Sequence, residues 1–219
     1  MNKLIIWGVS GHGKVVLDIV RAQGHFTDIV FIDDDSRKLV GEFRGCRIAG
    51  NRTELRNLRT SGYAYFVAAI GSNAARAECF QAACSMGVQP LTLVHPTAAV
   101  SQSSSIGPGT VVMPNAVVNP DSVIGANCII NSGAIVEHDC CISNHVHLSP
   151  GVALGGGVRV GAYSHIGLNA SVLPGIEIGE RAIVGAGAVV LEFVAPNDRV
   201  VGVPAKSLQR LATATGETL

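Results

Sequence analysis

One histidine of this chain is flanked by carboxylates on both sides. His138 lies between Glu137 and Asp139, and a second histidine, His147, follows nearby. A carboxylate beside an imidazole fixes its tautomer and raises its basicity, so the other ring nitrogen can accept a proton. We therefore interpret His138 as a candidate general base. His147 falls on another side of the structure expected below, so the two histidines can meet only if subunits pack side by side.

A glycine-rich segment near the N-terminus could bind phosphate. Gly8–Gly13 follows an apolar run and precedes an amphipathic one, which places its N–H groups at a helix N-terminus. The spacing is G-x-x-G-x-G rather than G-x-G-x-x-G, so a nicotinamide cofactor is not expected. Tight packing of helix on strand is the alternative explanation of the glycines. His12, Asp33–Asp34 and Gly71 favour a ligand, because they fall where the expected strands end.

Residues 1–95 alternate apolar runs with helical patterns. Strands are expected over 3–7, 29–32, 65–70 and 89–94, and helices over 14–23 and from Ser72 or Asn73 to Met86. This alternation is typical of a small Rossmann-like α/β domain with a parallel sheet.

An aliphatic residue occupies every sixth position from Val100 to Val190. The series is Val100, Ile106, Val112, Val118, Ile124, Ile130, Val136, Ile142, Leu148, Leu154, Val160, Ile166, Val172, Ile178, Val184 and Val190. A fixed six-residue period predicts a parallel β-helix. Three hexapeptides would form each triangular coil, with the aliphatics stacked inside at a spacing of ~4.8 Å.

The positions between these aliphatics fit the same architecture. Four residues after each one stands mostly a small side chain, such as Ala116, Cys128 or Ala134, where the interior narrows near a corner. We assign residues 96–206 to the β-helix, with 197–206 as a loop leaving it, and residues 207–219 to a C-terminal tail.

Composition limits the possible partners. Sixteen Lys and Arg residues balance sixteen Asp and Glu residues, which argues against binding nucleic acid or a membrane surface. We expect no signal peptide and no membrane span. The six cysteines form no C-x-x-C pair, so neither a disulfide framework nor a metal site is expected, and a cytoplasmic location is predicted.

Five short segments accompany the hexapeptide array in a fixed order. They are Ser10–Val15, Phe31–Asp34, Ala69–Gly71, Val136–Cys140 and Gly202–Lys206. Together they resemble the sugar O-/N-acyltransferase family of left-handed β-helix enzymes. Within it they resemble the nucleotide-amino-sugar N-acetyltransferase branch of the bacillosamine and perosamine pathways. The resemblance implies a homotrimer with acetyl-CoA between neighbouring prisms, a nucleotide-linked sugar on the N-terminal domain, and no metal.

The resemblance also implies roles for individual residues. His138 matches the general base that deprotonates the attacking amine, and Asp139 matches its supporting carboxylate. Acetyl-CoA contacts fall at His147, the N–H of Gly156, Leu168 and Ala186. The nucleotide-sugar pocket falls at Ser10, Gly11, His12, Asp33, Asp34 and Gly71.

The function predicted from this resemblance is acetyl-CoA-dependent N-acetylation of a nucleotide-linked 4-amino-4,6-dideoxy sugar, with UDP as the favoured nucleotide. Three alternatives stay open. The acceptor could be a hydroxyl, as in sialic acid O-acetyltransferases. His138, His145 and His147 could bind zinc across an interface, as in carbonic-anhydrase-like β-helices. The β-helix could also be a non-catalytic scaffold.

Overall fold

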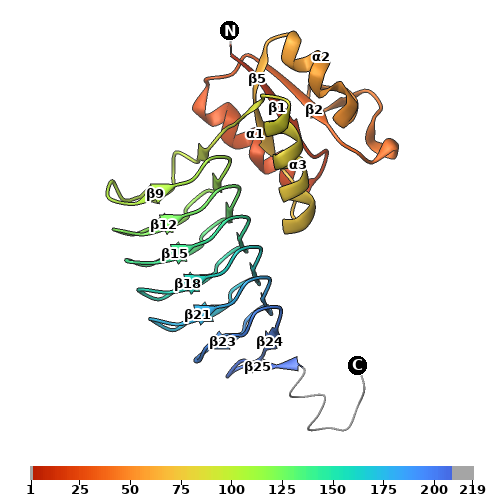
Figure 1. Cartoon of the computed structure of the whole chain (residues 1–219). Coiled ribbons are helices and arrows are strands. Elements are labelled where there is room, and N and C mark those ends of the chain that lie inside the picture. Colours follow the sequence, from red (N-terminus) through yellow and green to blue (C-terminus); the bar gives the residue numbers. More distant parts are fainter. Residues whose placement is uncertain (1, 209–219) are drawn as a thin grey trace. The chain divides into compact units, whose positions relative to one another are not determined.

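The computed structural model describes residues 2–208 and divides into two compact units, Met1–Pro96 and Thr97–Leu219. The units are described separately (Figure 1). The predicted tail over 207–219 lies, beyond Leu208, outside the described residues. Across the described part of the chain, no helix has the length and apolar character needed to cross a membrane.

The first unit is an α/β domain. Its sheet has the order β3-β4-β2-β1-β5-β6, and all neighbouring strands are parallel except β3 and β4. The strands are β1 (Lys3–Trp7), β2 (Asp28–Ile32), β3 (Glu42–Phe43), β4 (Cys46–Ile48), β5 (Tyr63–Ala68) and β6 (Gln89–Pro90), with β7 (Leu93–Val94) after them. The helices are α1 (Gly11–Gln23), α2 (Leu55–Thr60) and α3 (Asn73–Ser85), with short 3-10 turns η1 (Ser36–Lys38) and η2 (Arg52–Glu54).

Most of this domain follows the predicted alternation, and four details differ. The predicted strand over 65–70 is β5, which begins at Tyr63 and ends at Ala68. The predicted helix over 14–23 begins three residues earlier, because Ser10 is extended and its Oγ accepts from Gly13 N at 3.1 Å. The predicted strand over 89–94 is two short strands. The β3–β4 hairpin and α2 were not predicted, because they are too short to show a clear hydrophobic period.

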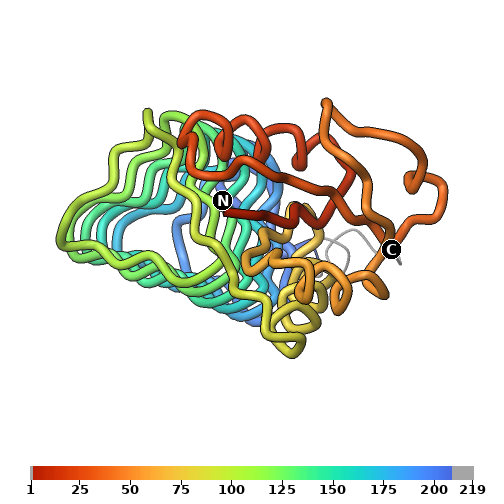
Figure 2. The backbone as a smooth tube through the Cα atoms, turned by 90° about the horizontal axis from the view of Figure 1, so that it is seen from above, coloured from red at the N-terminus to blue at the C-terminus, as the bar shows by residue number. Residues whose placement is uncertain are grey.

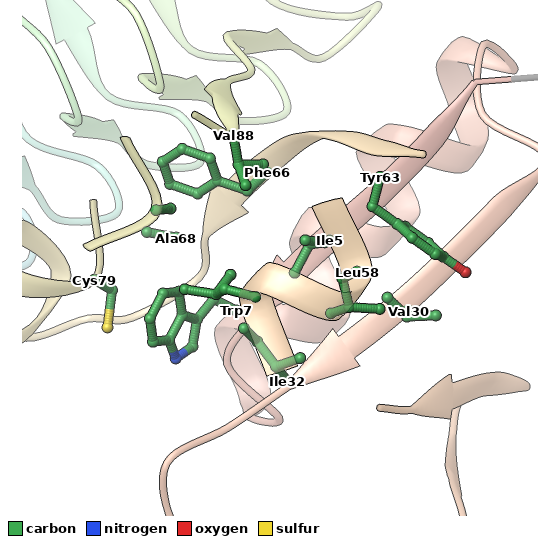
Figure 3. Close-up of a cluster of buried hydrophobic side chains, with 12 residues drawn as sticks. Ile5, Trp7, Val30, Ile32, Leu58, Tyr63, Phe66, Ala68, Cys79 and Val88 are labelled. Carbon is green, nitrogen blue, oxygen red and sulfur yellow. The ribbon is translucent and has the colours of Figure 1, made fainter. Parts of the chain in front are cut away.

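A buried apolar cluster holds the sheet of this domain together. Figure 3 shows Cys79 on one side of the Trp7 ring and Ile32, from the neighbouring strand, on the other, and Phe66 and Leu58 belong to the same cluster. Trp7 is 1% exposed although it is the last residue of β1. The carboxyl ends of β1 and β2 are thereby fixed to each other, and the segments that follow them start from a rigid edge.

The second unit is a left-handed parallel β-helix with three faces. Face 1 consists of β8 (Ala99–Val100), β11 (Val117–Val118), β14 (Ile135–Val136), β17 (Ala153–Leu154), β20 (Ser171–Val172) and β23 (Val189–Val190). Face 2 consists of β9 (Ser105–Ile106), β12 (Val123–Ile124), β15 (Cys141–Ile142), β18 (Arg159–Val160) and β21 (Glu177–Ile178). Face 3 runs through β10 (Val111–Val112), β13 (Ile129–Ile130), β16 (His147–Leu148), β19 (His165–Ile166), β22 (Ile183–Val184), β24 (Arg199–Val201) and β25 (Lys206–Ser207).

Each coil stacks on the next with an offset of eighteen residues, as where Val118 pairs with Val136 and Val136 with Leu154. Seen from above, the turns from green to blue follow nearly the same outline (Figure 2). The expectation that 197–206 is a loop leaving the prism is wrong. β24 pairs with β22 and then with β25, so this segment extends face 3.

The aliphatic series points inward as predicted. Every member from Val112 to Val190 is at most 3% exposed, whereas Val100 and Ile106 in the first coil are half-buried. The small residues near the corners are buried too, and their hydroxyls bridge coils. Ser122 Oγ donates to Glu137 O at 2.7 Å and accepts from Cys140 N at 3.1 Å. A buried hydroxyl with both partners avoids the desolvation cost of an unpaired polar group.

Replacing Ile130 with Asp tests the inward register. Ile130 is 0% exposed and stacks between Val112 and Leu148, so Ile130→Asp buries an unpaired carboxylate between coils. We expect the protein to be insoluble or unfolded, as measured by soluble yield and circular dichroism. The matched control is Val123→Asp, because Val123 points outward and is 52% exposed. A folded, soluble Ile130→Asp protein would contradict the register.

Candidate active site

The corner after β14 presents a hydrogen-bonded histidine–carboxylate pair. His138 Nδ1 lies 2.7 Å from Asp139 Oδ2, and the two side chains are 62% and 66% exposed. The carboxylate accepts a hydrogen bond from Nδ1–H, so the neutral ring keeps Nε2 as a proton acceptor. The hydrogen bond to Asp139 raises the pKa of His138, with a smaller opposing effect of desolvation. The pair has the proton affinity and accessibility of a general base.

The coil geometry fixes where Asp139 lies. Asp139 occupies the fourth position of its hexapeptide and has a left-handed backbone, φ 60°. The fourth position is left-handed in every hexapeptide from Gly109 to Gly187. Asp, Asn and Gly adopt this conformation more readily than other residues. A turn that the repeat requires for its own closure therefore holds the carboxylate beside the imidazole.

Gly156 lies next to His138 one coil further along. A Cβ on Gly156 would be 2.6 Å from Cε1 and 2.7 Å from Nε2 of His138, so the ring rests against the glycine backbone. The neighbouring Gly157 N–H donates to His138 O at 2.8 Å and ties the two corners together. Within residues 2–208 the N–H of Gly156 itself has no backbone acceptor. The imidazole and an unengaged donor thus occur side by side.

The lack of a backbone acceptor for this N–H is a property of the third position in the repeat. Gly156, Leu168 and Ala186 all occupy that position, and the backbone bonds of the described coils leave each of their N–H groups without an acceptor. Prolines, which have no N–H, fill the same position elsewhere. They are Pro108, Pro114, Pro120, Pro150 and Pro174. The acetyl-CoA contacts predicted at Gly156, Leu168 and Ala186 therefore fall on N–H donors that have no backbone acceptor in the described coils.

The predicted residues of the β-helix fall into two separate groups on one chain. His138 and Gly156 lie at corners between faces 1 and 2. His147 lies in β16 on face 3, and Leu168 and Ala186 lie at the corners that follow β19 and β22, between faces 3 and 1. His147 is half-buried, and its Nε2 lies 3.1 Å from Asn131 Nδ2. The structure does not bring His147 to His138 within one prism.

The neighbours of His145 indicate a structural role for this side chain. Its Nδ1 lies 2.9 Å from Asn127 Nδ2, its ring packs on Tyr163 with centroids 4.8 Å apart, and it is 9% exposed. Among the residues from 2 to 208, no cluster of three or more His, Cys, Asp or Glu side chains could hold a metal ion.

The α/β domain contains the predicted ligand pocket. Ser10, Asp33, Asp34 and Gly71 line a cavity of about 340 Å³ at the carboxyl ends of the strands. The predicted Gly11–His12 are not among the lining residues. Gly8 is needed for packing, because a Cβ there would lie 2.4 Å from Ala69 O, so the alternative explanation of the glycines holds in part.

Four charged or aromatic residues of this cavity were not predicted. Trp7, Lys38, Arg52 and Glu78 also line it. Arg52 packs over the Trp7 ring at 5.6 Å, and its Nη2 donates to Asp34 at 2.7 Å. In the sequence, Trp7 is the last residue of an apolar run that predicts a strand, and its indole carries a polar N–H group. Lys38 and Arg52 come from connecting segments without any motif, and only folding brings them to the strand ends.

The acidic residues of the cavity are already engaged by the protein. Asp33 Oδ2 accepts from Val9 N at 2.8 Å and from Lys38 Nζ at 3.2 Å. Burial alone would raise the pKa of Asp34, but the hydrogen bonds and charge of Arg52 outweigh it and lower that pKa. Hydrogen bonds from the protein therefore orient both carboxylates at the cavity wall.

His12 is a neutral histidine at neutral pH. Burial, and secondarily the charge of Arg76, lowers the pKa of His12 to about 4. Arg76 is 1% exposed and donates to Ile70 O at 3.1 Å and Gly71 O at 3.3 Å. A buried guanidinium thus lies behind the loop that forms one wall of the cavity, where its charge favours an anionic ligand.

Comparison with known proteins agrees with this arrangement. Residues 3–83 match the PglD N-terminal domain model, and residues 103–138 match the bacterial transferase hexapeptide model, six repeats. A perosamine N-acetyltransferase variant from Caulobacter crescentus, solved with CoA and GDP-perosamine, is 37% identical with a TM-score of 0.91. The alignment covers 94% of this chain and 97% of that one. This chain belongs to the nucleotide-amino-sugar N-acetyltransferases of the hexapeptide-repeat family.

Two other solved structures extend the comparison. The acetyltransferase domain of PglB from Neisseria gonorrhoeae FA1090, in complex with acetyl coenzyme A, is 37% identical with a TM-score of 0.90. WeeI from Acinetobacter baumannii AYE is 26% identical with a TM-score of 0.85. Each alignment covers 95% of this chain and 100% of the other. The nucleotide-amino-sugar N-acetyltransferase family therefore accounts for both units of the chain.

Gly156→Ala tests the contact between the glycine and the imidazole. The new methyl group occupies the space of the His138 ring, which must move away from Asp139 and from the Gly156 N–H. We expect kcat to fall by about tenfold or more, because displacement of a catalytic group by about 1 Å is costly. The melting temperature should change little, because the His138 side chain is exposed and can shift. Glu180→Ala, at the third position of another corner, is the control and should keep parental kcat. A fully active Gly156→Ala protein would contradict this geometry.

Proposed function

We propose that this chain transfers the acetyl group of acetyl-CoA to the 4-amino group of a nucleotide-linked 4-amino-4,6-dideoxy sugar. The observation that carries the proposal is the His138–Asp139 pair against Gly156. It occurs in a chain 37% identical to a protein crystallised with CoA and GDP-perosamine.

His138 is the proposed general base. An amine attacks a thioester only through its neutral form, and the C–N bond leaves the nitrogen with a proton to lose. His138 Nε2 takes that proton, and Asp139 stabilises the imidazolium through Nδ1. The C–S bond then breaks, the acetyl group stays on the sugar nitrogen, and His138 returns the proton to the CoA thiolate. No covalent enzyme intermediate is needed.

The Gly156 N–H is the proposed oxyanion donor. Addition of the amine turns the thioester carbonyl oxygen into an oxyanion, which a fixed donor stabilises without reorganisation. The N–H of Gly156 has no backbone acceptor among the described residues, and its backbone supports the His138 ring. The same few ångströms therefore offer the base and the donor that a tetrahedral intermediate requires.

We infer that the active site is shared between chains of a homotrimer. The proposed acetyl-CoA contacts His147, Leu168 and Ala186 lie on face 3 and its following corner, whereas His138 and Gly156 lie between faces 1 and 2. A second prism beside the first would supply the missing group. The outward N–H groups of Leu168 and Ala186 would then bind carbonyls of the pantetheine arm.

The cavity of the α/β domain is the proposed nucleotide site, with Ser10, Asp33, Asp34 and Gly71 in its wall. Gly11 and His12 open α1 beside it and offer N–H groups at the helix N-terminus. We favour UDP as the nucleotide. Guanine presents two adjacent donors that call for a carboxylate, and Asp33 and Asp34 already accept from the protein.

A panel assay tests the function and its alternative. The purified protein is given acetyl-CoA with UDP-, GDP- or dTDP-linked 4-amino-4,6-dideoxy sugars, or with sialic acid, and thiol release is followed. We expect turnover with an amino sugar, fastest with the UDP-linked one, and none with sialic acid. Release only with the hydroxyl acceptor would replace the proposal with O-acetylation.

The cytoplasmic location stays a prediction from the sequence.

His138→Ala should abolish most of the chemical step. General-base catalysis contributes about 100-fold or more, so kcat should fall by at least that factor while both substrates bind with parental affinity. The parent should lose kcat/KM as the pH falls through the pKa of His138, which lies above its ordinary value of 6.5. That acid limb should vanish in His138→Ala.

Asp139→Asn is the control for the raised pKa. It removes the interaction that favours the protonated ring, so the acid limb of kcat/KM should move to lower pH than in the parent. An unchanged limb in Asp139→Asn, or near-parental kcat in His138→Ala, would place the base elsewhere.

The shared site predicts the size of the active particle. Light scattering after gel filtration should give three times the chain mass of 22.6 kDa. Turnover should be lost on dilution below the concentration at which the particle dissociates. A monomer with full turnover would contradict the shared site.

A further inference from the structure

We propose that the guanidinium of Arg52 is the surface on which the nucleobase of the ligand stacks, and that Asp34 is a positioning residue for it. This role rests on the proposed function, because the cavity of the α/β domain acquires its nucleotide from that proposal. The two residues have different tasks. Arg52 touches the ligand, whereas Asp34 acts through Arg52.

The cavity offers a base one flat group, and that group is Arg52. Trp7 is the one aromatic side chain among the described residues that line the cavity, and it is 1% exposed, so a base cannot lie on the indole itself. The Arg52 guanidinium lies over the indole, with Cζ 5.6 Å from the ring centroid, and the Arg52 side chain is 49% exposed. A guanidinium is planar and stacks on flat ring systems. The side of Arg52 away from the indole is therefore the place for a base.

Asp34 holds Arg52 with both of its carboxylate oxygens. Oδ2 accepts from Arg52 Nε at 3.1 Å and from Nη2 at 2.7 Å, and Oδ1 accepts from Arg52 N at 3.2 Å. These bonds fix one edge of the guanidinium, while the Trp7 ring supports it on one side. Asp34 thus orients Arg52, and its oxygens are engaged before a ligand arrives.

The backbone that carries Arg52 is tied to the end of β2. Asp33 N donates to Gly50 O at 3.1 Å. Gly50 has a φ of 119°, which favours glycine, and a Cβ there would lie 2.8 Å from Glu54 Cγ. Arg52 follows two residues later and bonds to Asp34 as described. Because backbone and side chain are both fixed, a base loses little binding free energy in ordering the arginine.

A diphosphate is the other group that an arginine could bind. Arginine grips a phosphate through two N–H groups on one edge, and the Nε–Nη2 edge of Arg52 is occupied by Asp34. The carboxylate also offsets the charge that would attract an anion. In doubly wound sheets the phosphates lie at the N-terminus of the helix after the first strand, and the nucleoside lies towards the end of the second. Arg52 is bonded to the end of β2, which favours the base.

Replacements of Arg52 separate stacking from charge. Arg52→Ala removes the planar group, and we expect UDP to bind about tenfold more weakly, measured by calorimetry on the full chain. Arg52→Lys keeps the charge without the plane and should stay at least about fivefold weaker than the parent. Arg37→Ala is the matched control. Arg37 pairs with Asp35 at 2.9 Å, but its side chain is 87% exposed and it is not among the described residues that line the cavity, so UDP affinity should be parental.

Asp34→Asn tests the positioning role. Loss of the charged acceptor releases the guanidinium, so UDP binding should weaken. The double variant Asp34→Asn/Arg52→Ala should bind UDP no more weakly than Arg52→Ala alone, because Asp34 acts only through Arg52. Direct contact of Asp34 with the ligand would make the two losses add. Additive losses would therefore overturn the positioning role.

Trp7 gives a readout without ligand. It is the single tryptophan of the chain, so the fluorescence of the ligand-free protein reports its surroundings. Arg52→Ala uncovers the indole and should move the emission maximum to longer wavelength, whereas Arg37→Ala should leave it unchanged. An unchanged maximum in Arg52→Ala, or parental UDP affinity in Arg52→Ala or Arg52→Lys, would overturn the role of Arg52. If the parent binds none of UDP, GDP and dTDP, the proposed nucleotide site fails and the stacking role fails with it.

Discussion

The stacking of coils at an offset of eighteen residues is the constraint on which the catalytic half of this protein depends. Inward aliphatics such as Val136 and Leu154 must lie over one another to bury their surface, and this fixes the height and rotation of every coil. Each corner then closes through a left-handed fourth residue. Outward side chains take no part in this packing. The packing nevertheless decides on which coil and on which face each outward side chain lies.

The proposed catalytic groups lie at positions where the scaffold places few requirements on the residue type. The third residue of a hexapeptide has no backbone acceptor for its N–H, so proline is tolerated there and a glycine can offer the N–H to a ligand. The fourth residue must accept a left-handed backbone, which Asp139 does while it holds His138. Base, carboxylate and donor thus occupy corner positions without disturbing the buried ladders.

The α/β domain positions its cavity residues differently, because it has no repeat to place the groups that the proposed charged ligand requires. Here the strand ends supply the frame, and Trp7 anchors it from inside the core. Arg52 and Lys38 neutralise Asp34 and Asp33 at the wall. Buried Arg76 lies behind the neighbouring loop. The pocket is therefore preorganised by ion pairs that exist before a ligand arrives.

The sequence by itself determined the features that local backbone geometry encodes. These are the β-helix period, the inward ladder, the bounds of β1, and the pair His138–Asp139, whose members are neighbours in the chain. Only the tertiary structure decided which residues eighteen apart meet, as Gly156 does with His138 and His165 with His147. It also decided that Arg52 reaches the cavity at the strand ends from a connecting segment. A periodic sequence reports which side chains point outward, but their contacts depend on the lateral stacking of coils and strands, which no single segment encodes.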